Sequence, residues 1–335
     1  MKRFTLVALY CLIVILAACS GDRHRVDTSA VKYNAEFLRL DRAIFETPDD
    51  FERMELAMLK KQFGTFLPIY FTSIMQMPPP DNPMLPEFLT RFTEDPVWQK
   101  LQRDIEQTFP DLQAYEEQLE VGLKSYAVHF DEDSLPRLVA YNSGFNVGIY
   151  PSEQWLGVGL EWYLSPQNEV VKQLPPDLFP QYKRDKMKPE YLAVNALKGY
   201  LFYKHQEQSG EDMLSALVFN GKILYIAKSL MEVSDADLLN YTPPQLEWAE
   251  DSEYMIWTYL LENDLVFSTD FRQINKMMND GPFTPGMPAE SPGGVGNWLG
   301  LQMVEAYMNE NDELDLQDLL KAGNRQILEK YKPGR

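Results

Sequence analysis

Residues 191–231 have the sequence YLAVNALKGYLFYKHQEQSGEDMLSALVFNGKILYIAKSLM, and this stretch decides the fold. Apolar side chains recur every three to four residues on both sides of a short polar turn, which places each set on one helical face. Ser209 fits the N-cap of the second helix, and Asp212 lies where the positive end of the helix dipole favours a carboxylate. The stretch therefore predicts two helices, each packed against a core.

The N-terminus has the features of a bacterial secretory signal. Basic residues precede an apolar run at 4–16, which is shorter than the ~20 residues of a membrane span. The run ends in Leu-Ala-Ala-Cys, similar to a lipobox, which implies cleavage before Cys19 and lipidation of its thiol. We therefore expect a signal peptide at residues 1–18 and a polar, lipidated tether at residues 19–32, with an uncleaved anchor as the alternative. No acidic block follows Cys19, which favours an outer-membrane lipoprotein that faces the periplasm.

Composition limits the class of partner. The 335 residues are 45% hydrophobic, which is enough for one large domain or two closely packed ones. The formal net charge is −19, and no arginine-rich run interrupts it. Such a surface repels phosphate backbones, so nucleic acid is not an expected partner. After signal cleavage the mature chain keeps one cysteine, the lipidated one, which excludes disulfides and a thiol nucleophile.

The remaining patterns predict a mainly helical α+β protein. An amphipathic lead-in at 31–45 and a proline-punctuated surface loop at 64–88 accompany the first helices, and β-branched and aromatic residues at 136–164 predict two or three short antiparallel strands. Thr242-Pro243-Pro244-Gln245 predicts a capping box that starts a long helix through Leu261. Helical periodicity also marks residues 49–63, 96–109, 111–130, 270–278, 298–308 and 314–331. We divide the chain into a helical segment at 33–130 and an α+β segment at 131–335, packed as one unit.

Catalytic motifs are missing from the sequence. A zinc enzyme needs about three side-chain ligands, which an H-E-x-x-H helix supplies in part, and this motif is absent. The chain has only His24, His129 and His205, which we interpret as solvated or core histidines. The serine-hydrolase motif G-x-S-x-G is absent too. We expect no cofactor and no metal.

Two polar or glycine-rich stretches invite a ligand interpretation. Residues 292–300 lack the Lys-Ser/Thr ending of a phosphate loop and the glycine spacing of a dinucleotide site, so we favour a tight turn with Asn297 as N-cap. Residues 309–313 lack the glycine of a calcium loop. The candidate binding surface is aromatic, with core packing as the alternative. It comprises Trp248, Trp257, Gly294, Gly296 and Trp298.

Several stretches, taken together and in order, resemble one known family. They are LRLDRAIFE (38–46), VGLEWYL (158–164), NGKILYIAKSLM (220–231), YTPPQLEW (241–248) and SPGGVGNWLG (291–300). The chain is similar along nearly its whole mature length to GldB, the gliding-motility-associated lipoprotein of Bacteroidota. The resemblance implies an envelope lipoprotein that, in gliding species, serves motility and the linked type IX secretion apparatus. Relatives also occur in non-gliding species.

The GldB family is in turn distantly similar to predicted zinc peptidases with H-E-x-x-H on one helix and a ligand glutamate on the next. That similarity implies a zincin-like helical pair. Asn195 and Gly199 would replace the two histidines, Ala196 the base and Asn220 the third ligand. The register of the first motif is open by a residue or so.

The resemblance and the missing motifs lead to one hypothesis of function. We expect a non-catalytic subunit of motility or type IX secretion machinery, with the membrane and other envelope lipoproteins as partners. The alternative is a hydrolase, or a peptide- or glycan-binding lipoprotein, that uses the degenerate cleft.

Overall fold

The computed structural model describes residues 23–46 and 53–334, and its centre is the predicted helical pair. Helix α10 (Leu192–His205) and helix α11 (Met213–Met231) are joined by the 3-10 turn η4 (Gln206–Gln208). The N-cap of α11 is Asp212, whose carboxylate accepts from Ser215 N (2.8 Å). The prediction of Ser209 as N-cap is wrong, because its hydroxyl donates to the carbonyl of Gln206 instead.

A four-stranded sheet lies beneath this pair in the order β1-β2-β4-β3. Its strands are β1 (Phe37–Arg39), β2 (Arg137–Tyr141), β3 (Ile149–Pro151) and β4 (Trp155–Gly159). Only β3 and β4 are antiparallel, whereas β1 pairs parallel to β2 and β2 parallel to β4. The expectation of an antiparallel sheet confined to 136–164 is therefore wrong. Its edge strand β1 comes from the amphipathic lead-in, where three residues are too few to show an alternating pattern.

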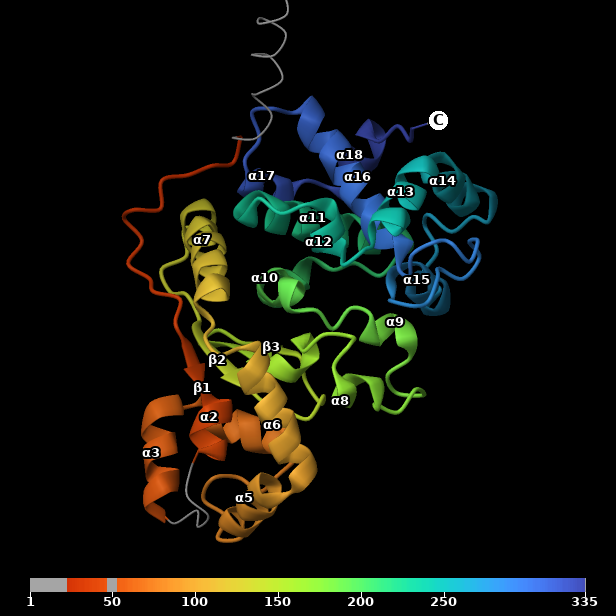
Figure 1. Ribbon diagram of the computed structural model, residues 1–335. Helices are drawn as coiled ribbons and strands as arrows, with labels where there is room; N and C mark the ends of the chain where they lie inside the picture. Colours follow the sequence, from red (N-terminus) through yellow and green to blue (C-terminus); the bar gives the residue numbers. More distant parts are fainter. Residues whose placement is uncertain (1–22, 47–52, 335) are drawn as a thin grey trace, which may run out of the picture.

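One face of the sheet packs against an N-terminal helical layer (Figure 1). Val139, Tyr141 and Trp155 point into this core. Its helices are α2 (Leu40–Phe45), α3 (Arg53–Phe63), α4 (Phe66–Ile69), the π-helical turn η1 (Tyr70–Ile74) and α5 (Leu85–Glu94). The predicted surface loop at 64–88 is thus wrong in its apolar half, because residues 66–74 are helical and several of their side chains are fully buried. One proline, Pro68, lies within α4, and the proline-rich run at 78–86 begins only after this turn.

The opposite face packs against the larger core. Leu138, Ala140, Leu156 and Val158 point toward it, in strict alternation with the residues of the other face. Helix α10 covers this face, and helices α6 (Pro96–Thr108) and α7 (Gln113–Phe130) contribute side chains to the same core. Helices α6 and α7 share a core with the C-terminal residues, so the core divides at the sheet and not at residue 130.

Helix α16 (Val295–Glu310) crosses α11 at very close range. A Cβ on Gly221 would lie 2.1 Å from the carbonyl oxygen of Gly300, and one on Gly300 would lie 2.0 Å from that of Leu217. Only glycine allows two backbones to approach this closely.

The other C-terminal helices surround this crossing. They are α12 (Asp235–Leu239), α13 (Pro243–Asp251), α14 (Glu253–Glu262), α15 (Phe271–Met278), α17 (Leu316–Lys321) and α18 (Asn324–Lys330). The shorter turns are η2 (Leu160–Tyr163), α8 (Glu169–Lys172), α9 (Gln181–Arg184) and η3 (Pro189–Tyr191). The capping box at Thr242 is confirmed. The prediction of a single long helix after it is wrong, because the helix is interrupted at Ser252. The last predicted helix is likewise two helices, separated near Ala322.

Residues 23–25 lie against the body of the protein. Arg23 donates to the carbonyls of Met308 (2.5 Å) and Asn311 (2.5 Å), at the negative end of the α16 dipole. His24 contacts the Tyr225 hydroxyl (3.1 Å), and its carbonyl accepts from His129 Nε2 (2.8 Å). Residues 23–25 of the expected tether are therefore bound to the folded body of the protein.

Helix α11 has the length and composition of a membrane span, the only such helix among the described residues. However, 61% of its most apolar window is buried inside the protein. Its apolar character is explained by its place in the core.

Candidate functional site

Three of the four predicted metal-site positions face protein interior. Ala196 is fully buried, and a Cβ on Gly199 would lie 2.7 Å from Ile149 Cγ2, so this part of α10 packs on the sheet. Asn195 Oδ1 accepts from Asn240 Nδ2 (3.0 Å). These positions serve packing and local hydrogen bonding.

Asn220, the fourth position, lines a pocket of about 330 Å³ between α10 and α11, which we call the α10–α11 pocket. The residues of α10 that share its wall are Lys198 and Phe202. The polar residue of α10 that shares this pocket with Asn220 is thus Lys198, one position before Gly199. The structure does not bring Asn220 together with Asn195 and Gly199 in one cavity.

Two lysines give the α10–α11 pocket its charge. Lys186 forms an ion pair with Asp280 (2.6 Å) and lies 5.9 Å from the centre of the Tyr241 ring. Lys198 donates to the carbonyl of Leu238, and burial, aided by the nearby charge of Lys186, lowers its pKa to about 7. A desolvated ammonium held only by a carbonyl favours an anionic ligand.

The glycine-rich loop forms one wall of this pocket through Gly293 and Asn297. The N-cap of α16 is Gly294 in the left-handed region (φ 67°), so the prediction of Asn297 as N-cap is wrong. Asn297 Nδ2 instead donates to the carbonyls of Met278 (2.8 Å) and Gly294 (3.0 Å). A Cβ on Gly296 would lie 2.6 Å from Met278 Sδ, so this glycine serves close packing.

The predicted aromatic surface is divided by the fold. Trp298 is 2% exposed and belongs to the larger core, which makes its ring inaccessible to a ligand. Trp248 and Trp257 are half-buried against the same core, and Trp257 packs edge-on against Tyr331 (5.4 Å between ring centres). Core packing, the alternative interpretation, accounts for Trp298.

The histidines contact aromatic groups. His205 Nε2 lies 3.3 Å from the Tyr126 hydroxyl, and burial lowers the pKa values of His24 and His205 to about 4. Within residues 23–46 and 53–334, no three His, Cys, Asp or Glu side chains are grouped as metal ligands would be. Cys19 lies outside the described residues.

Comparison with known proteins supplies a family. The family model of the gliding motility protein GldB matches residues 21–333, nearly the whole chain. The chain belongs to the GldB family. No curated protein and no solved structure matches it. Membership makes it a lipoprotein of the cell envelope with a role associated with gliding motility.

Three of the five stretches that suggested GldB converge on the α10–α11 pocket, although they are far apart in sequence. Asn220 comes from NGKILYIAKSLM, Tyr241 from YTPPQLEW, and Gly293 and Asn297 from SPGGVGNWLG. Sequence reasoning missed Lys198, which lies between them. The available signal was a lysine in the middle of a mostly apolar helix.

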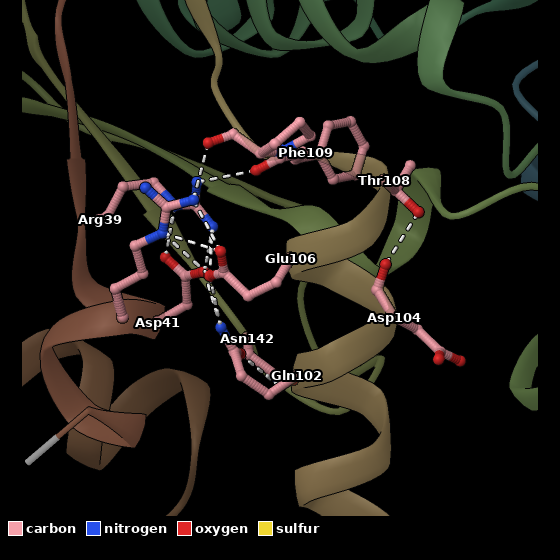
Figure 2. Close-up of polar contacts among 10 residues, drawn as sticks. Arg39, Asp41, Gln102, Asp104, Glu106, Thr108, Phe109 and Asn142 are labelled. Atoms are coloured by element: carbon pink, nitrogen blue, oxygen red, sulfur yellow. Dashed lines mark hydrogen bonds and ion pairs between the residues drawn. The ribbon is translucent and has the colours of Figure 1, made fainter.

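A fourth GldB-like stretch, LRLDRAIFE, forms a polar network between β1, α2 and α6 (Figure 2). Arg39 binds both oxygens of fully buried Asp41 (2.8 and 2.6 Å) and reaches Glu106 (3.0 Å). Gln102 Nε2 also donates to Asp41 (3.0 Å), and Arg42 pairs with Glu106 (2.6 Å). Because each charge has a partner, the network is an internal connection between the sheet and the helices beside it.

The fifth such stretch, VGLEWYL, carries the buried carboxylate of Glu161. Its Oε1 accepts from the backbone of Ser143 (2.9 Å) and Phe145 (3.1 Å) and from the Ser143 hydroxyl. Burial raises the pKa of Glu161 to about 7, although these donors lower it. The group fixes the loop that follows β2.

Proposed function

We propose that this GldB-family protein is a non-catalytic accessory subunit of gliding-motility or type IX secretion machinery, anchored by a lipid on Cys19 in the outer membrane and facing the periplasm. The observation that carries the proposal is the structural use of the peptidase-like positions. Gly199 and Ala196 are occupied by packing, and Asn195 is bonded to Asn240. An enzyme would keep such positions free for substrate and ligand.

Exposed apolar side chains near α14 and α15 support a role in assembly. The strongly exposed examples are Tyr254, Met255, Leu261, Phe267, Phe271 and Phe283. Phe271 is 72% exposed and Phe267 59%, values that are unusual for large aromatic residues and typical of contact surfaces. We assign the partner contact to this corner of the molecule.

Copurification tests the proposal. Tagged, lipidated protein is isolated from gently solubilised membranes, and the proteins that accompany it are identified and quantified. We expect motility or secretion lipoproteins in near-stoichiometric amounts. A protein that purifies alone would contradict the accessory role.

Paired substitutions locate the contact. Phe267→Ser with Phe271→Ser removes two exposed rings and should reduce copurification at least about tenfold, the cost of losing aromatic contacts at an interface. Leu178→Ser is the matched control, because Leu178 is 62% exposed but lies far away in sequence, between α8 and α9. An equal loss in both variants would refute the assignment of the surface.

The hydrolase alternative has its own test. Peptides and peptidoglycan fragments are incubated with the purified protein, and hydrolysis that survives stringent purification would replace the non-catalytic proposal. Loss of function in a folded Asn195→Ala, Asn220→Ala variant would likewise indicate a working site at these positions.

A further inference from the structure

The α10–α11 pocket has the dimensions of a small ligand site. Its volume of about 330 Å³ is near the lower end of the ~300–1,000 Å³ found for small-molecule sites. It is walled by the consecutive helices α10, α11 and α12 and by residues from 278–297, a segment farther along the chain. A ligand would therefore enter with only one small group or one residue.

One wall supplies a cation without a carboxylate. The Lys198 ammonium has a single hydrogen-bond partner in the described structure, the carbonyl of Leu238. Lys186 is already paired with Asp280, so Lys198 gives the pocket a net positive charge within a protein of net charge −19. An ammonium has three donors, and two are left for a ligand anion.

A second wall supplies an acceptor. Asn240 ends α12 in the left-handed region (φ 54°) and donates to Asn195, which fixes its amide. Its Oδ1 atom is buried and has no hydrogen-bond partner within the described structure. An unpaired buried carbonyl is costly, and an N–H donor from a ligand would remove that cost.

The remaining wall is apolar. Phe202, Leu224 and Leu239 line the same pocket, and Leu224 and Leu239 are themselves buried. The cation matches a carboxylate, the acceptor matches an amide N–H, and the apolar wall matches an apolar side chain. The C-terminal residue of a peptide carries all three groups.

We propose that the α10–α11 pocket binds the C-terminal residue of a peptide with an apolar side chain. The terminal carboxylate pairs with Lys198, its amide N–H donates to Asn240 Oδ1, and the side chain packs on Phe202 and Leu239. This inference does not depend on the accessory role, because a motility subunit or a free-standing lipoprotein could carry the pocket equally.

Binding should take up a proton. The pKa of Lys198 near 7 means that the free pocket is partly neutral at neutral pH, whereas a bound carboxylate favours the ammonium. The other titratable side chains of the pocket are Lys186 and Asp280, which are paired, and Tyr241, whose pKa burial raises well above 10. Affinity should therefore fall by up to about tenfold per pH unit above pH 7.

Calorimetric titration of the full-length protein in detergent tests the site. The probes are N-acetyl-Ala-Leu, its C-terminal amide, and octanoate. We expect the free acid to bind and the amide to bind at least about tenfold more weakly, because a charge-assisted bond is lost. Equal affinity for acid and amide, no binding of the acid, or tighter binding of octanoate than of the peptide would overturn the proposal.

Variants assign the effect to Lys198. Lys198→Met should abolish binding and the pH dependence, whereas Lys198→Arg keeps the charge and should bind within a few-fold. Lys276→Met, which removes an exposed lysine outside the pocket, is the matched control and should bind as the natural protein does. Unchanged binding in Lys198→Met would refute the site. If Lys198→Met fails to fold, the acid–amide comparison and the pH dependence decide the question in the natural protein.

Discussion

At the residue scale, Glu161 links stability to pH. Its folded pKa of about 7 lies above the ordinary value of 4.5, so the folded state holds the proton more tightly than the unfolded chain. The free energy of unfolding should therefore fall as pH rises from about 4.5 to 7, by about 3 kcal/mol from this one group. Glu161→Gln keeps the acceptor for Ser143 and Phe145 and should lose this dependence, as measured by urea unfolding between pH 5 and 8.

The effect of Glu161 is the difference between the pH profile of the natural protein and that of Glu161→Gln, because other groups also titrate in this range. His24 and His205 have folded pKa values lowered from 6.5 to about 4, so they stabilise the fold as pH rises through that interval. Their slope opposes that of Glu161 and is present in both proteins. Parallel pH profiles for the natural protein and Glu161→Gln would show that Glu161 does not titrate in this range.

Single residues also mark the limit of inference from sequence. Glu161 lies in the GldB-like stretch VGLEWYL, yet nothing in that stretch indicates that Ser143 and Phe145 turn their N–H groups toward it. Lys198 has no role in the peptidase motif, whose positions are metal ligands, so the resemblance gave no reason to single it out. Both roles depend on a neighbour brought close only by folding.

At the element scale, helices were easier to predict than strand pairing. Helices α10, α11, α6 and α7 carry their own signal, because apolar residues recur along one continuous stretch. The partner of a strand is set by contacts between distant residues, and β1 pairs with β2 across about a hundred residues. The interruptions of helices at Ser252 and Ala322 were not predicted, because the apolar periodicity of the sequence continues through them.

The α11–α16 crossing yields a prediction for one element pair. Gly221→Ala places a methyl group 2.1 Å from the backbone oxygen of Gly300, which cannot move aside as a side chain could. The helices must separate, and we expect a loss of at least about 2–3 kcal/mol in the free energy of unfolding, measured by urea denaturation.

A glycine with room around it provides the control. At Gly323 the nearest atom to an added Cβ is Gln326 Oε1 at 3.4 Å, and the backbone is extended (φ −73°). Gly323→Ala should change stability by less than about 1 kcal/mol. Similar losses in Gly221→Ala and Gly323→Ala would mean that the close crossing is not the cause.

At the scale of the whole molecule, the sheet separates two hydrophobic cores. Their boundary does not coincide with the division of the sequence into 33–130 and 131–335. Alternation along β2 sends Leu138 and Ala140 to the larger core, and Val139 and Tyr141 to the N-terminal one. After Arg137 the strand is apolar, which indicates burial on both faces but not which helices cover each face. Helices α6 and α7 therefore could not be assigned to a core before the fold was known.

The start of the described chain bears on the lipid anchor that we propose. Arg23 is four residues after Cys19, and four extended residues span at most about 14 Å. With the lipid that we propose on Cys19, the contacts of Arg23 with Met308 and Asn311 would hold the C-terminal end of α16 close to the bilayer. The opposite end, with α3 and α5, would point away from it (Figure 1).

Releasing Arg23 tests this arrangement. Arg23→Ala removes the cation from the negative end of α16 and its three hydrogen bonds to backbone carbonyls, worth about 1–2 kcal/mol together. Opening of the segment should become about tenfold more frequent, and trypsin cleavage after Arg25 in membrane-bound protein should accelerate by a similar factor, because cleavage follows the open population. Lys32→Ala, which alters an exposed residue of the same segment and leaves the Arg25 site intact, should cleave as the natural protein does. Rapid cleavage after Arg25 in the natural protein, unaffected by Arg23→Ala, would mean that the segment is a free tether and that the body is not oriented by it.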